Sequence, residues 1–149
     1  IIRGLVGSEM CIRDSLATMS ELKTPILVVV SGEGGSGGAL AISVGDHLSM
    51  LEYAIYSVAS PEACASIIWR EADKAPEAAK AMKVSSKDLK KINIIDEIIT
   101  EPLGGAHRDY DLMAENIKSS LIKNLSILNK LSLDDLLDRR YKRILEIGS

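Results

Sequence analysis

Apolar residues recur along this chain with two spacings, and the change from one to the other predicts a series of strands and helices. Short apolar runs predict strands at 26–30, 47–52, 53–59 and 94–100. Apolar residues three or four positions apart predict helices at 15–24, 39–44, 60–69, 74–82, 85–93, 109–130 and 132–147. Because strands and helices intermix along the whole chain, the predicted fold class is α/β.

Several of these helices carry typical end residues. The Ser-Pro-Glu sequence at 60–62 combines an N-cap serine, a proline at the first helical position and an acid in the first turn. Ser15 is expected to be the N-cap of the first helix, and Pro25 is expected to end that helix. Gly45 is expected to terminate the short apolar helix at 39–44.

The most distinctive stretch is Gly32-Glu-Gly-Gly-Ser-Gly-Gly38, which lies between a predicted strand and a predicted helix. Five of its seven residues are glycines without a Cβ, so either a ligand approaches the backbone closely or the chain turns sharply. Backbone N–H groups at such a junction can face a bound anion. We therefore compare three functional interpretations of this glycine stretch with a ligand-free tight turn.

The first interpretation is a dinucleotide-binding site. Gly32-x-Gly34-x-x-Gly37 has the spacing of that fingerprint, and Glu52 lies where an acid that binds the ribose is expected. The short helix predicted after the glycines argues against it. A phosphate-binding P-loop is weaker still, because the Lys-Ser/Thr ending of that motif is missing.

The second interpretation is a serine hydrolase. Gly34-x-Ser36-x-Gly38 has the spacing of a nucleophile elbow, and Asp96 and His107 follow in the order of a catalytic triad. Several glycines separate Ser36 from the preceding strand, which is unlike an elbow. The chain also has only two histidines that can act as the base.

The third interpretation is an oxyanion hole, which needs no nucleophilic side chain. Two adjacent N–H groups at the start of a helix stabilise negative charge on an enolate or carboxylate. Glycine is needed there because a Cβ would hold a planar acyl or ureido group away from the backbone. This interpretation agrees with the absence of His, Cys and Lys from the stretch.

Composition narrows the class of protein. The 149 residues are 46% apolar and 26% charged, as in a soluble globular domain, and the absence of Phe predicts an aliphatic core. The net charge of −3 gives no general attraction to nucleic acid or membranes, and no apolar run has the ~18 residues of a membrane span. Cys11 and Cys64 are too few for a disulfide framework or a four-cysteine zinc site, and Cys64 is expected to be buried. We expect a cytoplasmic or plastid-stroma protein.

Other charged residues are expected to be structural. The basic cluster Arg139–Arg143 follows several acids, which predicts a solvated or subunit-contacting helix. His47 is expected in a turn, and His107 in a solvent-facing loop. Trp69 is expected in the core or at an interface.

Longer blocks of sequence carry a resemblance to a known family. They are Gly32–Leu40, Tyr56–Trp69, Ala72–Pro76, Ile94–Ile99 and Glu101–Arg108. In content and order they resemble the carboxyltransferase alpha subunit of bacterial and plastid acetyl-coenzyme A carboxylase. The resemblance implies the crotonase (ClpP-like) fold. It also implies transfer of a carboxyl group from carboxybiotin, on a biotin carboxyl carrier protein, to acetyl-CoA, which forms malonyl-CoA for fatty-acid biosynthesis.

The resemblance also implies roles for residues and partners. Gly37 and Gly38 correspond to the oxyanion hole for the biotin ureido oxygen, and Gly34, Gly35 and Ser36 to cofactor-binding positions. The implied partners are a carboxyltransferase beta subunit in an alpha2beta2 assembly, the carrier protein and biotin carboxylase. The beta subunit supplies the second oxyanion hole and the zinc ribbon, so no metal is expected in this chain.

The family's alpha subunit is about twice as long as this chain, so a C-terminal fragment with an incomplete crotonase fold is expected. Residues 1–15 do not match the family and are expected to be an artefact. Residues 16–108 are expected to be the C-terminal part of the carboxyltransferase domain, and 109–149 a C-terminal helical segment. The fragment alone is expected to be inactive, and a non-catalytic scaffold is the alternative to an enzyme.

Overall fold

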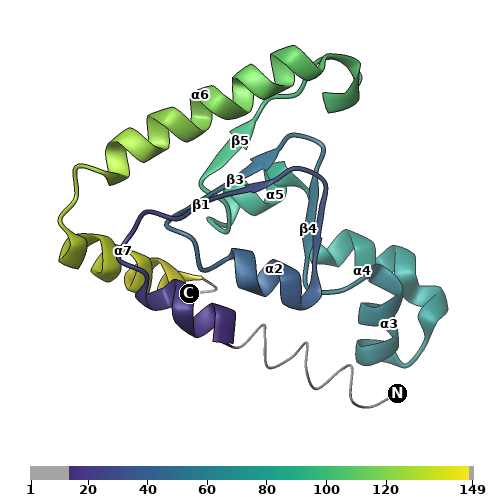
Figure 1. The fold of residues 1–149 in the computed structure, drawn as a ribbon. Helices are drawn as coiled ribbons and strands as arrows, with labels where there is room; N and C mark the ends of the chain where they lie inside the picture. The colour runs from purple at the N-terminus through teal and green to yellow at the C-terminus, as the bar shows by residue number, and fades with distance from the viewer. Residues whose placement is uncertain (1–13, 148–149) are drawn as a thin grey trace.

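The computed structural model describes residues 14–147, in which strands and helices alternate (Figure 1). Cys11 and almost all of the segment 1–15 lie outside the described residues. Residues 14–21 are helical. The remaining elements are β1 (Leu27–Val30), β2 (Glu33–Gly35), α2 (Ser36–Ile42), β3 (His47–Leu51), β4 (Ile55–Ser57), α3 (Pro61–Trp69), α4 (Ala75–Met82), α5 (Ser86–Lys91), β5 (Glu97–Ile99), α6 (Tyr110–Leu128) and α7 (Leu133–Glu146). Short 3-10 turns lie at Ala72–Lys74 and Ala106–Arg108.

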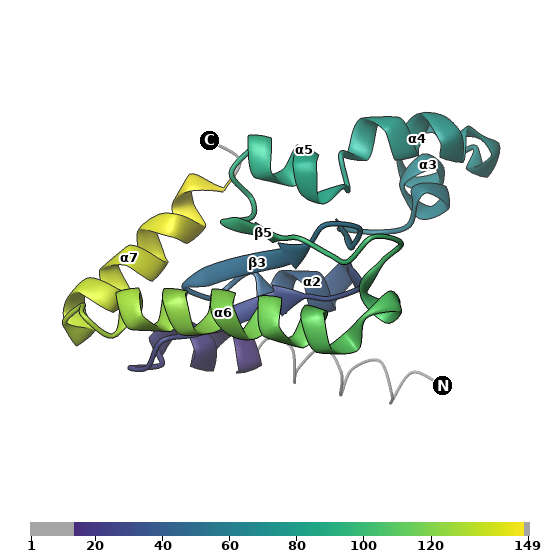
Figure 2. The same cartoon turned by 90° about the horizontal axis from the view of Figure 1, so that it is seen from above.

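The strands form two small parallel sheets. The first has the order β1-β3-β5, and the second pairs β2 with β4. Helix α6 lies on one side of the three-stranded sheet and α2 on the other, while α7 and the pair α3 and α4 lie at opposite ends (Figures 1 and 2). The core between these layers is mainly aliphatic, as the composition predicts, and is centred on Leu48, Met50, Leu51, Ile95 and Ile99.

The sequence patterns predicted most of the elements in their observed order, and the start of α3. Ser60 is the N-cap of α3, where its hydroxyl accepts the Ala63 N–H at 3.2 Å, as predicted. Cys64 is buried against α4, also as predicted. The prediction for Ser15 is wrong, because Asp14 is already helical and Ser15 therefore lies inside the helix.

The strand predictions were too long, and one strand was missed. Only Ile55–Ser57 and Glu97–Ile99 of the runs at 53–59 and 94–100 pair with a neighbour. Glu33–Gly35 forms a strand against β4, although glycine is disfavoured in strands. Within the described residues, no helix combines the length and hydropathy needed to cross a membrane.

A buried ion pair closes the end of the sheet where the strands begin. Arg140 of α7 and Asp46, just before β3, are 1% and 0% exposed. The Arg140 guanidinium donates two hydrogen bonds to the Asp46 carboxylate and three to the carbonyl oxygens of Met19, Leu22 and Thr24. These bonds use all five N–H donors of the guanidinium, so neither buried charge lacks a partner. The pair thereby joins the chain before β1, the start of β3 and the last helix.

This pair corrects the prediction for the basic cluster. Arg139–Arg143 was expected to be a solvated or subunit-contacting helix face, but Arg140 is fully buried. Arg139 donates to the carbonyl oxygen of Asp46 at 2.9 Å, and Arg143 is largely buried against Asp96. The partners of these arginines lie far away in the sequence, so the local pattern of charges could not reveal them.

His47 and Glu97 form a second polar contact, between β3 and β5. His47 begins β3 rather than a turn, and its Nε2 lies 3.4 Å from Oε2 of Glu97. Burial lowers the pKa of His47, against the opposite effect of Asp96 and Glu97. Burial would raise the pKa of Glu97, but hydrogen bonds from Ser120, Asn124 and Lys123 outweigh it and lower that pKa to about 2. Glu97 is therefore held as a carboxylate that ties α6 to the sheet.

We expect Arg140→Met to lower the free energy of unfolding by about 3–5 kcal/mol, because the Asp46 carboxylate would stay buried without its partner. Urea unfolding at pH 7, followed by circular dichroism, measures this change. Lys142→Met in the same helix is the control, since its ion pair with Asp138 lies on the surface and contributes little. Equal effects of the two substitutions would contradict the assigned role of the buried pair.

We expect Glu97→Gln to destabilise the chain by about 2 kcal/mol at pH 7 and by much less near pH 2. The folded-state pKa lies below the ordinary 4.5, so the contribution is present above about pH 4.5 and is lost as the pH falls toward about 2. Urea unfolding of both proteins across this pH range tests the expectation. A difference that does not change with pH would refute it.

Candidate active site at the glycine stretch

The glycine stretch lies where β1 ends, at the carboxyl edge of the parallel sheet. From there the chain forms β2 and then turns directly into α2. β2 is held by parallel pairing with β4, and the Ile55 N–H donates to the carbonyl oxygen of Gly32 at 2.9 Å. The carboxyl edge of a parallel sheet is where ligands commonly bind in α/β proteins.

The glycines differ in what surrounds them. A Cβ on Gly34 would lie 2.8 Å from Cδ2 of Tyr56, so the tyrosine ring occupies the space that a side chain would need. A Cβ on Gly32 or Gly38 would meet nothing within 4 Å, and one on Gly35 would only reach the Ser57 carbonyl oxygen at 4.0 Å. Packing therefore explains Gly34, while open space remains beside Gly38.

Gly37 and Gly38 are the second and third residues of α2. The first N–H groups of an α-helix have no acceptor within the helix, so these two glycines carry donors that a ligand can use. Ser36, the first residue, has φ of +56°, a left-handed conformation that is strained for a residue with a side chain. The sharp turn at Ser36 takes the chain from β2 into α2.

A cavity of about 330 Å³ lies along the face of α2 that carries Ser36 and Ala39, and neither Gly37 nor Gly38 is among the residues that line it. Its lining is mostly apolar, and its hydroxyl-bearing residues are Ser36, Ser43, Tyr56 and Ser57. Among the described residues that line it there is no histidine, acid, lysine or arginine. The cavity therefore offers hydrogen bonds and apolar contacts, and its lining supplies no general base.

The structure does not bring the proposed hydrolase residues together in this cavity. Asp96 accepts the Leu48 N–H at 2.7 Å and forms an ion pair with Arg143 at 3.0 Å, so its carboxylate is already used. His107 lies in the exposed 3-10 turn that follows Gly105, as the sequence predicted. Nothing in the described part of the chain supports a Ser36 nucleophile.

The dinucleotide interpretation also lacks support. Glu52, the acid expected on the ribose, lies 3.5 Å from Nζ of Lys87. Helix α2 has only seven residues, as the sequence argument against this interpretation anticipated. Within residues 14–147, no cluster of three His, Cys, Asp or Glu residues can hold a metal ion.

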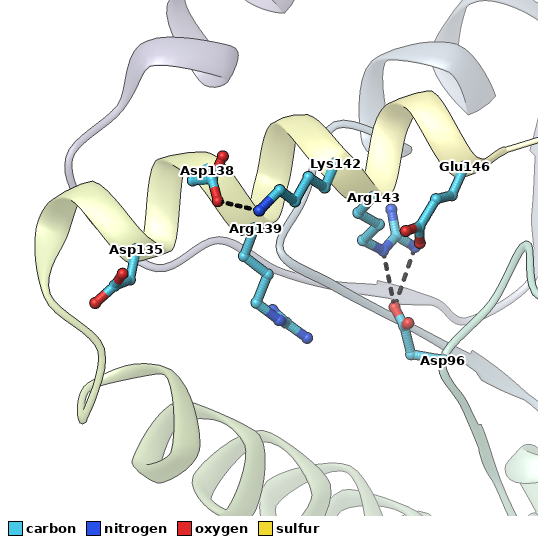
Figure 3. A pocket seen from close by; sticks show the side chains of 7 residues that line it. All are labelled: Asp96, Asp135, Asp138, Arg139, Lys142, Arg143 and Glu146. Atoms are coloured by element: carbon cyan, nitrogen blue, oxygen red, sulfur yellow. Dashed lines mark hydrogen bonds and ion pairs between the residues drawn. The ribbon is translucent and has the colours of Figure 1, made fainter.

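A second hollow, of about 380 Å³, lies beside α7 and is entirely charged (Figure 3). Its lining residues are Asp96, Asp135, Asp138, Arg139, Lys142, Arg143 and Glu146. Lys142 pairs with Asp138 at 2.6 Å, and Arg143 pairs with Asp96. Opposite charges alternate across this surface, so it presents no concentrated charge to a ligand and belongs to the ionic network of α7.

Tyr56 is the residue at the glycine stretch to which sequence reasoning assigned no role. Its ring packs on Gly34, and its hydroxyl donates to the carbonyl oxygen of Ala39 at 2.5 Å. No local signal relates this tyrosine to a glycine in a different strand. Only the pairing of β2 with β4, which the sequence did not predict, places them together.

Comparison with known proteins identifies relatives across nearly the whole chain. The family model described as "Acetyl co-enzyme A carboxylase carboxyltransferase-like" matches residues 6–148, and so begins inside the segment 1–15. The chain is 54% identical over 142 residues to the acetyl-coenzyme A carboxylase carboxyl transferase subunit alpha of Vibrio cholerae. It is 55% identical over 143 residues to the subunit of the same name from Alcanivorax borkumensis. These matches cover 95% and 96% of this chain but only 44% of each relative, so the chain spans less than half of their length.

A solved structure supports the predicted fold. The match is to a chain of a Pseudomonas malonate decarboxylase hetero-tetramer in complex with coenzyme A, with a TM-score of 0.72 at 13% identity. It covers 94% of this chain and 55% of that chain. The fold is thus the α/β crotonase-like fold that the sequence resemblance implied. The family match over residues 6–148 shows that the chain belongs to the acetyl-coenzyme A carboxylase carboxyltransferase-like family.

Proposed function

We propose that this chain contributes the alpha side of the carboxyltransferase of acetyl-coenzyme A carboxylase. The reaction moves a carboxyl group from carboxybiotin, on the biotin carboxyl carrier protein, to acetyl-CoA and forms malonyl-CoA for fatty-acid biosynthesis. Family membership supports this reaction class. The site assignment depends on one observation: the space beside Gly38 is open, and the N–H groups of Gly37 and Gly38 lie in the first turn of α2, where they have no acceptor within the helix.

In this proposal, Gly37 and Gly38 form the oxyanion hole. Carboxybiotin supplies the carboxyl group, and negative charge builds on its ureido oxygen as the group leaves. The N–H groups of Gly37 and Gly38 donate to that oxygen, and the positive end of the α2 dipole adds to the effect. A preorganised donor of this kind contributes about 3–4 kcal/mol to transition-state stabilisation.

The same backbone forms a flat cradle for the planar ureido group. The empty space at the Cβ position of Gly38 lets a ring approach the N–H groups without a steric clash. Gly34, Gly35 and Ser36 are the cofactor-binding positions that lead into the donors. Among them, Ser36 also lines the adjoining cavity.

The chemistry around the glycine stretch supports a site shared with a partner. Neither the stretch itself nor the described lining of the neighbouring cavity includes a lysine or arginine to meet the phosphates of acetyl-CoA, so we assign that substrate to a carboxyltransferase beta subunit. Ile67, Ile68 and Val58 are exposed near α3, and such apolar surface is typical of a subunit contact. Trp69, at the end of α3, is only partly covered, in keeping with its predicted place at an interface.

We further propose an alpha2beta2 assembly that works with the carrier protein and biotin carboxylase, with no metal held by this chain. Its location is the cytoplasm or plastid stroma. Residues 16–108 form part of the carboxyltransferase domain and 109–149 a C-terminal helical segment, and the chain alone is inactive. As an alternative, the chain acts only as a scaffold for its partner. Malonyl-CoA formation by a complex of this chain with a beta subunit distinguishes an enzyme component from a scaffold.

We expect Gly38→Val to reduce carboxyl transfer at least about 100-fold in an alpha–beta complex, because the side chain fills the space beside the donors. Assembly should survive, because the Cβ of residue 38 meets no protein atom within 4 Å. Formation of malonyl-CoA from carboxybiotin and acetyl-CoA is the measurement. Gly32→Val is the matched control, since its Cβ position is also open but its N–H group lies outside the helix. Normal transfer by Gly38→Val would disprove the oxyanion-hole assignment.

We expect Ser36→Ala to keep the kcat for carboxyl transfer within about threefold, because the proposed donors are backbone groups. A nucleophilic Ser36 would instead make the alanine variant inactive by orders of magnitude. The same experiment includes a fluorophosphonate probe, which should label neither protein. Labelling that disappears in Ser36→Ala would favour the hydrolase alternative.

A further inference from the structure

One buried tyrosine contacts the chain on both sides of the proposed donors. Tyr56 is 9% exposed and lies in β4. Its ring edge occupies the space beside Gly34, before the donors, and its hydroxyl bonds to the carbonyl oxygen of Ala39, after them. One side chain thus spans the segment 35–38 from end to end.

The two contacts fix different degrees of freedom. Gly34 pairs with Tyr56 in the parallel register of β2 and β4, so the backbone also sets the position of the ring. Ala39 is the fourth residue of α2, and a hydrogen bond to its carbonyl restrains rotation of the helix about its axis. A helix of seven residues has little stability of its own, so its direction depends on such tertiary contacts.

The surroundings keep the tyrosine hydroxyl a hydrogen-bond donor. Burial raises the pKa of Tyr56, and this outweighs the opposite effects of Ser43 and Arg143. Arg143 also donates to the carbonyl oxygens of Ser43 and Gly45, just after α2. Tyr56 thus holds the middle of the helix, and Arg143 holds the residues that directly follow it.

We propose that Tyr56 is a positioning residue for carboxyl transfer, which sets the direction of the Gly37 and Gly38 N–H groups without touching the substrate. The inference rests on the proposed function, because it assumes that these N–H groups are the oxyanion donors. A tyrosine that only fills the core would affect stability and leave the kcat of the assembled enzyme unchanged.

The test is Tyr56→Phe in the assembled alpha–beta complex, which keeps the ring and removes the bond to Ala39. We expect kcat to fall at least about tenfold, while the KM for acetyl-CoA stays within about twofold. Tyr53→Phe is the matched control, because Tyr53 is 61% exposed in the same region and should behave as the unsubstituted complex. A kcat within twofold of the unsubstituted complex would overturn the inference.

A second variant disturbs the same tyrosine from its other contact. Gly34→Ala places a Cβ against the Tyr56 ring and should also lower kcat, and the double variant should lose less than the product of the two effects. If Tyr56→Phe does not assemble, Gly34→Ala decides the question: a lower kcat with an unchanged KM for carboxybiotin supports the inference, and an unchanged kcat rejects it. Normal transfer by Gly38→Val would reject the oxyanion-hole assignment on which this inference rests, whereas an inactive Gly38→Val with a normal Tyr56→Phe rejects only the role of Tyr56.

Discussion

The buried pair of Asp46 and Arg140 is the interaction on which the rest of the structure depends. It joins the segment before β1, the turn before β3 and helix α7, which are distant in the sequence. Burying two charges is costly unless every donor and acceptor is paired, and here the guanidinium uses all of its N–H groups. The last helix is therefore an integral part of the sheet's support. The arginines of its basic cluster bind groups within the chain and do not form a binding surface.

This arrangement divides the work between the two ends of the sheet. Ionic contacts fix the end where the strands begin, and the glycine backbone lies at the end where they finish. Arg143 also acts at the end where the strands begin: it pairs with Asp96 before β5 and donates to the carbonyl oxygens of Ser43 and Gly45, between α2 and β3. A site made of backbone N–H groups has no side chain to adjust, so its precision depends on how rigidly the helix is held.

Local signals in the sequence were enough for much of the fold. Capping at Ser60, the aliphatic core and the alternation of strands and helices all follow from neighbouring residues, and the structure has them. The structure also has contacts that no local signal contains. Arg140 pairs with Asp46, which lies 94 positions earlier in the sequence. The segment Glu33–Gly35 is a strand only because it pairs with β4. The resemblance to the family supplied the fold, which spacing alone could not have distinguished.

The glycine stretch shows why spacing was ambiguous. It fitted a dinucleotide fingerprint, a nucleophile elbow and an oxyanion hole at once. A glycine pattern shows which positions lack a side chain, but it does not show the reason for which the side chain is absent. The structure separates the positions: the space at Gly34 is filled by Tyr56, whereas the space at Gly32 and Gly38 is open, and of these two only Gly38 lies at the start of α2. An internally filled position serves the packing of the loop, whereas an empty position beside unused N–H groups has room for a ligand. The argument for an oxyanion hole therefore depends on Gly38 and its neighbour, and the other glycines make the turn that presents them.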